Sequence, residues 1–357
     1  MRETWRLLDT GGRSAAENMA LDAVLLEGKE KGLIPNTLHF LQFSPPAALV
    51  GYHQSIEQEI RLDYCQERGI EVNRRLTGGG AIYLDNAQLG WGLVCGRADL
   101  KAGSTLSALA EKIGQGVAVG IRRLGVEARF RPRNDIEVNG RKISGTGGAF
   151  SGEALLYQGT LLIDLDLETM AAALKITPKK LAARELQSIR ERLTCLKTEL
   201  GITPGLAAAR EALQEGLAEA LQIHFAEGEL TPWERASWEE RLEEFRSEEW
   251  IHASRDLPGE VRWLQGTYRS PAGTIQVALQ TDVERAVLKQ LLLTGDFFLH
   301  PQRTILDLEA WLRNTPLAAL EENLQRFFAD RTPDMLGLEA GDFLQAIDQT
   351  LNEVKQA

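Results

Sequence analysis

Residues 133–145 read Arg-Asn-Asp-Ile-Glu-Val-Asn-Gly-Arg-Lys-Ile-Ser-Gly and predict a β-hairpin. The pair Asn139-Gly140 is typical of a two-residue type I′ turn, in which both central residues take positive φ. A turn at this pair makes Glu137 and Lys142 cross-strand partners. The stretch therefore predicts a tight antiparallel ribbon that carries a lysine.

The two faces of this ribbon are expected to differ, because successive residues of a strand point to opposite sides. Ile136 and Ile143 are expected to pair on one face. A lysine between carboxylates on the other face is either a surface ion pair worth under ~1 kcal/mol or a positioned cation for a carboxylate or an α-phosphate. In the second case a carboxylate is near enough to hold Mg²⁺. The residues expected on this face are Asp135, Glu137, Lys142 and Ser144.

A second candidate anion site precedes the ribbon. Arg74 and Arg75 end one predicted strand, Gly78-Gly79-Gly80 follows, and residues 81–84 form the next strand. Glycines let main-chain N–H groups approach an anion closely, and arginines supply cationic forks for phosphate or carboxylate. No Gly-Lys-Ser/Thr follows and no helix opens after the glycines, so the pattern is neither a Walker A loop nor a Rossmann fingerprint.

The order of the predicted elements indicates an α+β fold. Strands do not alternate strictly with helices, which disfavours a doubly wound parallel sheet and favours a largely antiparallel or mixed sheet flanked by helices. The composition changes near Pro258, so we expect a main domain at residues 1–255 and a smaller α+β domain at residues 258–357. Strands are predicted at residues 37–43, 48–52, 72–75, 81–84, 89–95, 155–163, 261–269, 273–279 and 288–292. Helices are predicted at residues 14–26 and 106–124, at several places between 167 and 245, and at residues 305–313, 317–328 and 338–354.

Composition and charge exclude several classes of protein. The net charge of −11 argues against a nucleic-acid partner, and no apolar run reaches the ~20 residues of a membrane span; the address expected by default is cytoplasmic. Cys65, Cys95 and Cys195 are far apart and odd in number, which predicts neither a disulfide framework nor a zinc site. Residues 121–142 hold seven basic side chains against three acids, so this stretch is the expected docking surface for an acidic partner.

The ribbon and the glycine segment, in this order and spacing, resemble the lipoate–protein ligase A family, which has the biotin/lipoate ligase fold. The resemblance runs the whole length of the chain, and its last motifs resemble the accessory domain of that family. Its most specific parts are the glycine segment and Lys-Ile-Ser-Gly at residues 142–145. The motifs that carry it are residues 18–22, 51–54, 74–83, 134–135, 140–145, 158–162, 179–183, 188–192, 273–277 and 295–298.

The resemblance implies an ATP-dependent ligase. Lipoate and ATP, with Mg²⁺, would give lipoyl-adenylate, and a lysine of a carrier such as the glycine cleavage H protein or a dehydrogenase E2 domain would then attack it; a monomer is expected. Lys142 would be the catalytic residue, bridging the lipoyl carbonyl and the α-phosphate, and Asp135 would hold Mg²⁺. Residues implied to bind ATP are Arg75, Gly80, Ala81, Ile82, Tyr83, Asn134, Asp135 and Lys142. Residues implied to bind lipoate are Arg74, Gly78, Gly79, Lys142, Gly159 and Thr160.

Two departures from the family pattern affect acyl selectivity, because Leu84 and Gln158 stand where the family commonly has histidine. Other functions therefore stay open. An octanoyltransferase of the same fold moves an acyl group from acyl carrier protein through a cysteine thioester without ATP. The resemblance places that cysteine just before the ribbon, where residues 129–133 contain none. A non-catalytic relative is the third possibility.

Overall fold

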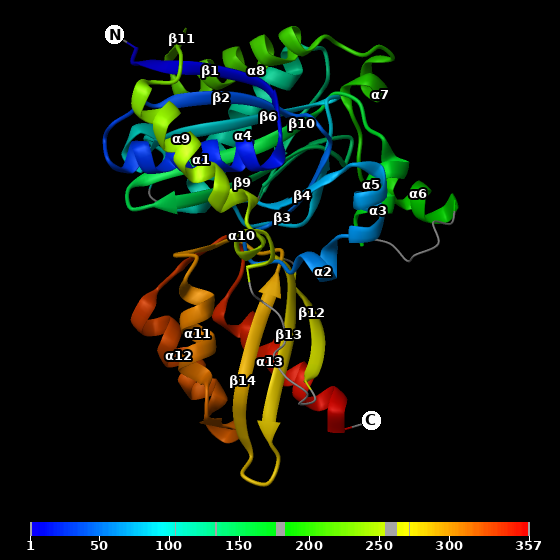
Figure 1. Cartoon of the computed structure of the whole chain (residues 1–357), viewed down its shortest axis with the longest axis vertical. Coiled ribbons are helices and arrows are strands. Elements are labelled where there is room, and N and C mark those ends of the chain that lie inside the picture. Colours follow the sequence, from blue (N-terminus) through cyan, green and yellow to red (C-terminus); the bar gives the residue numbers. More distant parts are fainter. Residues whose placement is uncertain are drawn as a thin grey trace. The chain divides into compact units, whose positions relative to one another are not determined.

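The computed structural model describes residues 2–103, 105–132, 134–175, 183–253, 263–270 and 272–355. The chain forms two compact units, both drawn in Figure 1. The division between the predicted catalytic and accessory domains near Pro258 falls outside the described residues, and the roles of the two domains stay predictions. The first unit contains Met1–Val50, Ile56–Thr77 and Ala81–Ile251, and the second contains Gly51–Ser55, Gly78–Gly80 and His252–Ala357.

An eight-stranded sheet forms the centre of the first unit, in the order β11-β1-β2-β6-β10-β9-β8-β7. Strand β1 runs parallel to β2 and β11, and the pairs from β2 to β7 are antiparallel. The predicted mixed sheet with flanking helices is therefore confirmed. The strands are β1 Thr4–Arg13, β2 Thr37–Phe43, β6 Gln88–Gly96, β7 Arg129–Arg131, β8 Asp135–Val138, β9 Arg141–Ser151, β10 Ala154–Leu162 and β11 His224–Glu227.

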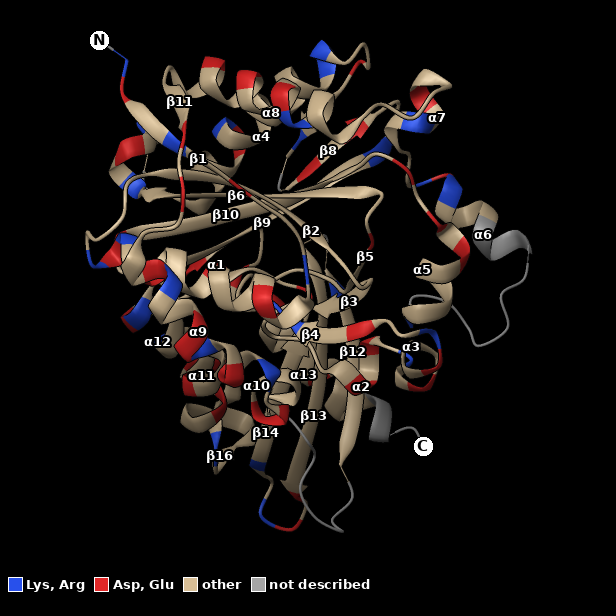
Figure 2. Ribbon diagram, turned by 45° about the horizontal axis from the view of Figure 1, so that its top comes forward, with Lys and Arg blue, Asp and Glu red and all other residues tan. Residues whose placement is uncertain are grey.

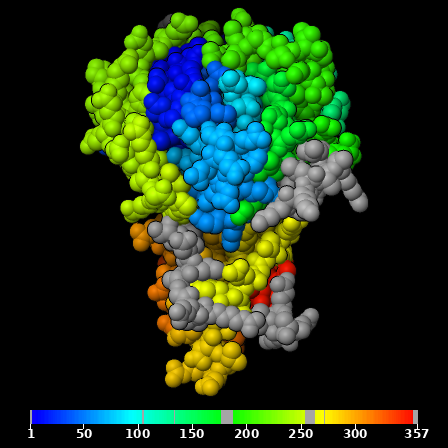
Figure 3. Space-filling model, turned by 45° about the vertical axis from the view of Figure 1, so that its right-hand side comes forward, coloured from blue at the N-terminus to red at the C-terminus, as the bar shows by residue number. Residues whose placement is uncertain are grey.

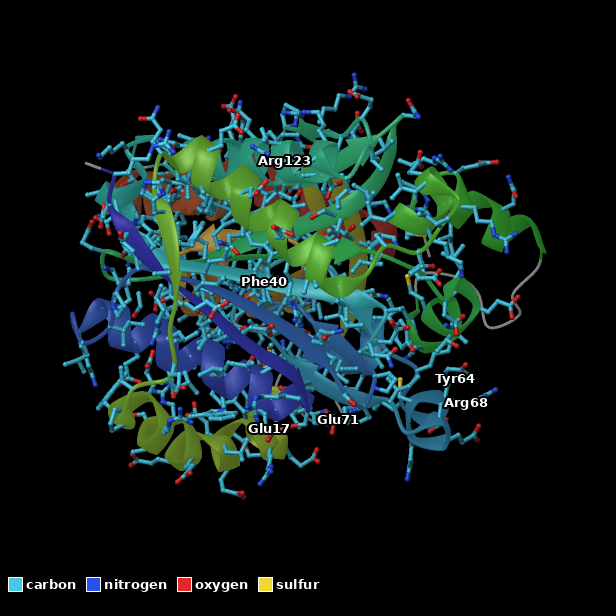
Figure 4. All side chains as sticks on the ribbon, turned by 90° about the horizontal axis from the view of Figure 1, so that it is seen from above. Glu17, Phe40, Tyr64, Arg68, Glu71 and Arg123 are labelled. Carbon is cyan, nitrogen blue, oxygen red and sulfur yellow. The ribbon has the colours of Figure 1, made fainter. Side chains whose placement is uncertain are left out.

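Helices cover both faces of this sheet, with α1 and α9 on one side and α4 and α8 on the other (Figures 1 and 4). Helix α1 begins as predicted, because Ser14 and Glu17 form a capping box that satisfies main-chain N–H groups of the first turn. Helices α4 and α8 approach closely at Gly120, where a Cβ would lie 2.6 Å from the carbonyl oxygen of Ala212. The bounds are α1 Ala15–Glu30, α4 Leu106–Arg123, α8 Leu206–Leu221 and α9 Pro232–Arg246.

A second, three-stranded sheet of the first unit has the order β4-β3-β5 and packs with short helices. Strand β4 ends at Arg74, so the predicted strand before the glycine segment is confirmed. The space-filling view shows the light-blue segment that contains α3 on the surface (Figure 3). The elements are β3 Ala47–Val50, β4 Glu71–Arg74, β5 Ile82–Leu84, α2 Ile56–Glu59, α3 Leu62–Arg68, η1 Arg97–Leu100, α5 Leu167–Ala173, α6 Ala183–Arg190, α7 Leu196–Leu200 and α10 Glu248–His252.

The second unit has its own sheet, β12-β13-β14-β16, and its own apolar core. The predicted strands at 273–279 and 288–292 are both present and each extends further than expected, and Phe297, Phe327 and Phe343 are fully buried. The elements are β12 Leu264–Ser270, β13 Gly273–Asp282, β14 Val287–Gly295, β15 Leu299–His300, α11 Thr304–Leu312, β16 Thr315–Pro316, η2 Leu317–Ala319, α12 Leu320–Arg331, β17 Asp334–Met335 and α13 Ala340–Lys355.

Three strands of the main sheet, β1, β7 and β11, were not predicted from the sequence. Of the helices in the described part of the chain, none has the length and apolarity that a membrane crossing requires. Acidic positions recur along α8 and α9 (Figure 2).

Candidate functional site

Strands β8 and β9 form the predicted ribbon. Asn139 and Gly140 have φ values of 51° and 77°, the positive values that the type I′ turn requires. Glu137 pairs with Lys142 across the strands, as predicted. The turn chemistry of two residues therefore fixes which side chains stand opposite each other at the tip of the ribbon.

A β-bulge changes the register one residue further along. Ile136 pairs with Ser144, and the predicted pairing of Ile136 with Ile143 is wrong. An extra residue in one strand reverses the alternation of faces beyond it. Ser144 is consequently fully buried opposite Ile136, and its predicted place beside Lys142 is also wrong.

The same bulge brings Lys142 over Gly145. The Lys142 Nζ lies 2.7 Å from Asp135 Oδ1, and a Cβ on Gly145 would lie 2.6 Å from both Cε and Nζ of Lys142. Glu137 instead pairs with Arg129, at 2.8 Å. The ammonium is therefore held by one carboxylate, not two. It lies over Gly145, where the Cβ of any other residue would collide with the lysine side chain.

Next to Lys142, the sheet carries a strip with few side chains. Thr160 on β10 stands between glycines of both neighbouring strands, and so does Gln158 two residues earlier. A Cβ at Gly92 would make only ordinary contacts, at 3.5 Å or more, so this position has room. An extended group lying on the strip would meet main chain, the two polar side chains and Leu41, whose side chain lies over Gly90. The flanking glycines are Gly90 and Gly145 beside Thr160, and Gly92 and Gly147 beside Gln158.

Gly159 lies on the opposite face from this strip. Its cross-strand partner is Trp91, and a Cβ on Gly159 would lie 2.6 Å from the Trp91 ring. Packing against Trp91 is thus a sufficient reason for glycine here. Of the two predicted acyl-site residues on β10, the structure brings only Thr160 to the face of Lys142.

The two arginines before the glycine segment are buried. The Arg74 Nε donates to the carbonyl oxygens of Trp250 and Ile251, at 3.3 and 3.2 Å, and the Arg75 Nε donates to Thr77 Oγ1 at 3.2 Å. Burial, and secondly the charge of Arg74, lower the pKa of Arg75 to about 10. Both guanidinium groups therefore have structural contacts, which do not test their predicted contacts with lipoate and ATP.

The remaining predicted nucleotide contacts differ in their surroundings. The Asn134 side chain donates to the carbonyl oxygen of Thr146 at 2.9 Å, which fixes the start of the ribbon. Tyr83 packs in an apolar core with Ala81, and burial raises its pKa; Ile82 packs against a neighbouring core. Gly78, Gly79 and Gly80 group with the second unit, and Gly79 has a φ of 94°, which favours glycine.

No group of three or more His, Cys, Asp or Glu side chains that could hold a metal ion occurs among the residues that the structure describes. Asp135 is one carboxylate, and it is paired with Lys142. Magnesium in nucleotide-binding enzymes is commonly held by one or two carboxylates together with the phosphates. Asp135 fits that arrangement only with a bound nucleotide, so the magnesium site stays a prediction.

The cysteines occupy different environments. Cys65 lies in the small-sheet core and Cys95 in the main sheet, and burial raises the pKa of Cys65 to about 11 and that of Cys95 further. Cys195 lines a hollow of about 490 Å³, together with Arg141 on the ribbon. Its side chain is 5% exposed. Cys195 is thus the cysteine that borders the ribbon and also reaches a hollow.

The basic stretch at residues 121–142 is not a free cationic surface. Arg122 donates to the carbonyl oxygen of Ala128. Arg123, labelled in Figure 4, pairs with Glu215 and Glu219 of α8, at 2.9 and 2.7 Å. The charge of Arg123 is offset by acids but that of Arg122 is not within the described part of the chain, and docking of an acidic carrier on this stretch stays a prediction.

Sequence reasoning missed the segment that holds Lys142 from outside the ribbon. The Lys142 main-chain N–H donates to the carbonyl oxygen of Arg192, and the Thr194 N–H donates to the carbonyl oxygen of Lys142, at 2.8 and 2.9 Å. These two bonds form a short parallel bridge between Lys142 and Leu193. A single bridge has no periodic sequence signal, so only the structure could place this segment.

Comparisons with known proteins identify the family to which the chain belongs. The family model of the lipoyl protein ligase A/B catalytic domain matches residues 14–218. The octanoyltransferase LipM of Kyrpidia tusciae is 29% identical over 70% of this chain and 98% of its own length, and that of Symbiobacterium thermophilum is 31% identical over 65% and 91%. The solved bi-partite lipoate protein ligase of Thermoplasma acidophilum is 28% identical, covers 73% of this chain and 100% of that one, and has a TM-score of 0.64.

The fold and these relatives define an enzyme class that contains lipoyl and octanoyl transferases and ligases. The chain belongs to the lipoyl protein ligase A/B family, which confirms the family that the sequence predicted. Within this family, the curated relatives support octanoyl transfer, given above as an alternative, better than the ATP-dependent ligase.

Proposed function

We propose that this chain transfers an octanoyl or lipoyl group to a lysine of a lipoyl-carrier protein. The observation that carries the proposal is the Lys142 ammonium, held by Asp135 above Gly145 at the end of the strip marked by Thr160. Transfer of an acyl group builds negative charge on the acyl oxygen, and a fixed cation at that point stabilises the transition state more than the ground state.

The first form of the proposal is octanoyl transfer from a thioester of acyl carrier protein. It is supported by the LipM octanoyltransferases, of which this chain covers 91% and 98%. A thioester intermediate needs a thiol that the donor can reach, and Cys195, which is buried but lines the hollow beside Arg141, is the candidate. The donor thioester would exchange with the Cys195 thiol, and the carrier lysine would then take the acyl group as the thiol is released.

Replacing Cys195 with serine tests this form. If the thioester form holds, the variant should lose at least a hundredfold in octanoyl transfer, because a serine hydroxyl is a far weaker nucleophile than a thiolate. The control is a double variant in which Cys65 and Cys95 are serine, which should retain transfer apart from losses of stability. Normal octanoyl transfer by a folded Cys195→Ser protein would rule out Cys195 as the acyl carrier.

The second form is ATP-dependent ligation of lipoate or octanoate. It is supported by the lipoate protein ligase from Thermoplasma acidophilum and by the burial of Cys65 and Cys95, whose raised pKa values keep them as thiols at neutral pH. In this form Lys142 would bridge the acyl carbonyl and the α-phosphate. Asn134 and Asp135 are the predicted ATP-binding residues that lie on the ribbon with Lys142.

One experiment separates the two forms. The same protein is given a lipoyl-carrier domain and either octanoyl-acyl carrier protein without ATP, or octanoate or lipoate with ATP and Mg²⁺, and carrier mass is followed. Modification of the carrier only with octanoyl-acyl carrier protein supports the transferase. Modification only with the free acid and ATP supports the ligase, as does ATP–pyrophosphate exchange that requires lipoate or octanoate. A carrier domain whose mass is unchanged with every donor would contradict the proposed function.

A further inference from the structure

Lys142 has a neighbouring segment on each edge of its strand. On one edge lies β8, where Glu137 is the partner of Lys142. On the other edge Arg192 accepts from the Lys142 N–H, and Thr194 donates to its carbonyl oxygen. Lys142 is also at the bulge, where the β8–β9 ladder is irregular and gives less support. Residues 192–194, here called the outer segment, therefore supply the support that the ribbon lacks at Lys142.

The carboxylate of Glu199 links the ribbon to the outer segment. Glu199 Oε1 on α7 accepts from Arg141 Nη2 at 2.7 Å and from Thr194 Oγ1 at 2.5 Å. Arg141 is the neighbour of Lys142 on the ribbon, and Thr194 is the residue that donates to the Lys142 carbonyl. The Glu199 side chain is 12% exposed, so solvent screens these bonds only weakly.

We infer that Glu199 is a positioning residue for Lys142, an assignment that rests on the proposed function of that lysine. Glu199 does not contact the ammonium. It ties the outer segment to the ribbon immediately before Lys142, which fixes where the Lys142 side chain starts. Since a displacement of about 1 Å in a reacting group can cost on the order of a hundredfold in rate, loosening this tie lowers turnover without removing a substrate contact.

Kinetics of Glu199→Ala test this role. We expect kcat for carrier acylation to fall roughly ten- to a hundredfold, with KM for the carrier changed less than about twofold. Glu199→Gln keeps an acceptor oxygen for Arg141 or Thr194 and should recover part of the loss. The control is Glu27→Ala, which breaks the 2.5 Å ion pair with Lys31 on α1, away from the hollow beside Cys195; its kcat should be close to that of the unaltered protein.

A double-mutant cycle with Lys142→Ala separates positioning from general stability. If Glu199 acts through Lys142, Glu199→Ala should cost little in a protein that already lacks the lysine, because the two effects are not additive. An equal fold-loss in both backgrounds, or a normal kcat for Glu199→Ala, would overturn the inference while Lys142 keeps its role. A normal kcat for Lys142→Ala alone would instead remove the proposed role of the lysine, and the inference with it.

Discussion

Replacing Lys142 with alanine is expected to lower the rate of carrier acylation roughly a hundred- to a thousandfold, a loss of ~3–4 kcal/mol in transition-state stabilisation. The ammonium has little freedom, because Asp135 lies 2.7 Å from it and its main chain is bonded to Arg192 and Thr194. It is therefore already in place when charge develops on the acyl oxygen. Steady-state kinetics with a lipoyl-carrier domain should show the loss in kcat.

The prediction holds for either donor, since both a thioester and an acyl-adenylate place negative charge on the acyl oxygen during transfer. Lys142→Arg should restore little activity, because a planar guanidinium cannot occupy the place of a compact ammonium. Lys29→Ala is the control, since Lys29 also pairs with an aspartate, Asp99, at 3.7 Å, and neither residue lines the hollow beside Cys195. A folded Lys142→Ala protein that acylates carrier within a few-fold of the unaltered rate would reduce Lys142 to a surface ion pair.

The local structure of the ribbon could be predicted wherever one residue type dictates the backbone. Asn139-Gly140 predicted the turn and the pairing of Glu137 with Lys142 correctly, because few residues adopt positive φ at both positions. The bulge after Lys142 could not be predicted, since Ile143 and Ser144 are both compatible with either register. That single shift decides which carboxylate holds Lys142.

Two of the three missed strands of the main sheet, β1 and β11, lie where periodicity is interrupted. Strand β1 contains Gly11 with a φ of 66° and a register shift between Asp9 and Gly12, so its alternation breaks in the middle. Strand β11 is mostly exposed at the edge of the sheet and carries no apolar face. Both strands depend on a neighbour far away in the sequence, and their pairing is a property of the whole sheet.

The candidate site was predicted by motif but not in its three-dimensional arrangement. Lys142 and Thr160 share one face, whereas the adjacent Gly159 faces Trp91. The sequence contains all of the glycines beside Thr160 and Gln158, but their alignment into two rows follows only from the register of three strands. Residues 192–194 likewise bond to Lys142 from about fifty residues further along the chain, and such a long-range contact leaves no local sequence pattern.

The buried ion pair between Arg6 and Glu234 is expected to dominate the stability of the first unit. The Arg6 guanidinium binds both carboxylate oxygens, at 2.5 and 2.8 Å, and Glu234 also accepts from the Thr231 N–H in the capping box of α9. The Glu234 side chain is fully buried. Glu234→Ala leaves the Arg6 charge buried without this partner and should cost about 3–5 kcal/mol in the free energy of unfolding, measured by urea denaturation at pH 7.

The contribution of this pair should also depend on pH. Burial by itself raises the pKa of Glu234, but hydrogen bonds from Arg6 and Thr231 and the charge of Arg6 outweigh it, so the pKa in the folded protein lies below the ordinary 4.5. A carboxyl with a lowered folded pKa stabilises the fold fully above its unfolded pKa, and this stabilisation is lost as pH falls through the folded value. The difference in unfolding free energy between the unaltered protein and Glu234→Ala should therefore be constant near neutrality and shrink below about pH 4.5. Glu229→Ala, which removes an exposed partner of Arg235 at 3.3 Å, should cost under ~1 kcal/mol; equal losses for the two variants would show that the buried pair adds nothing beyond a surface contact.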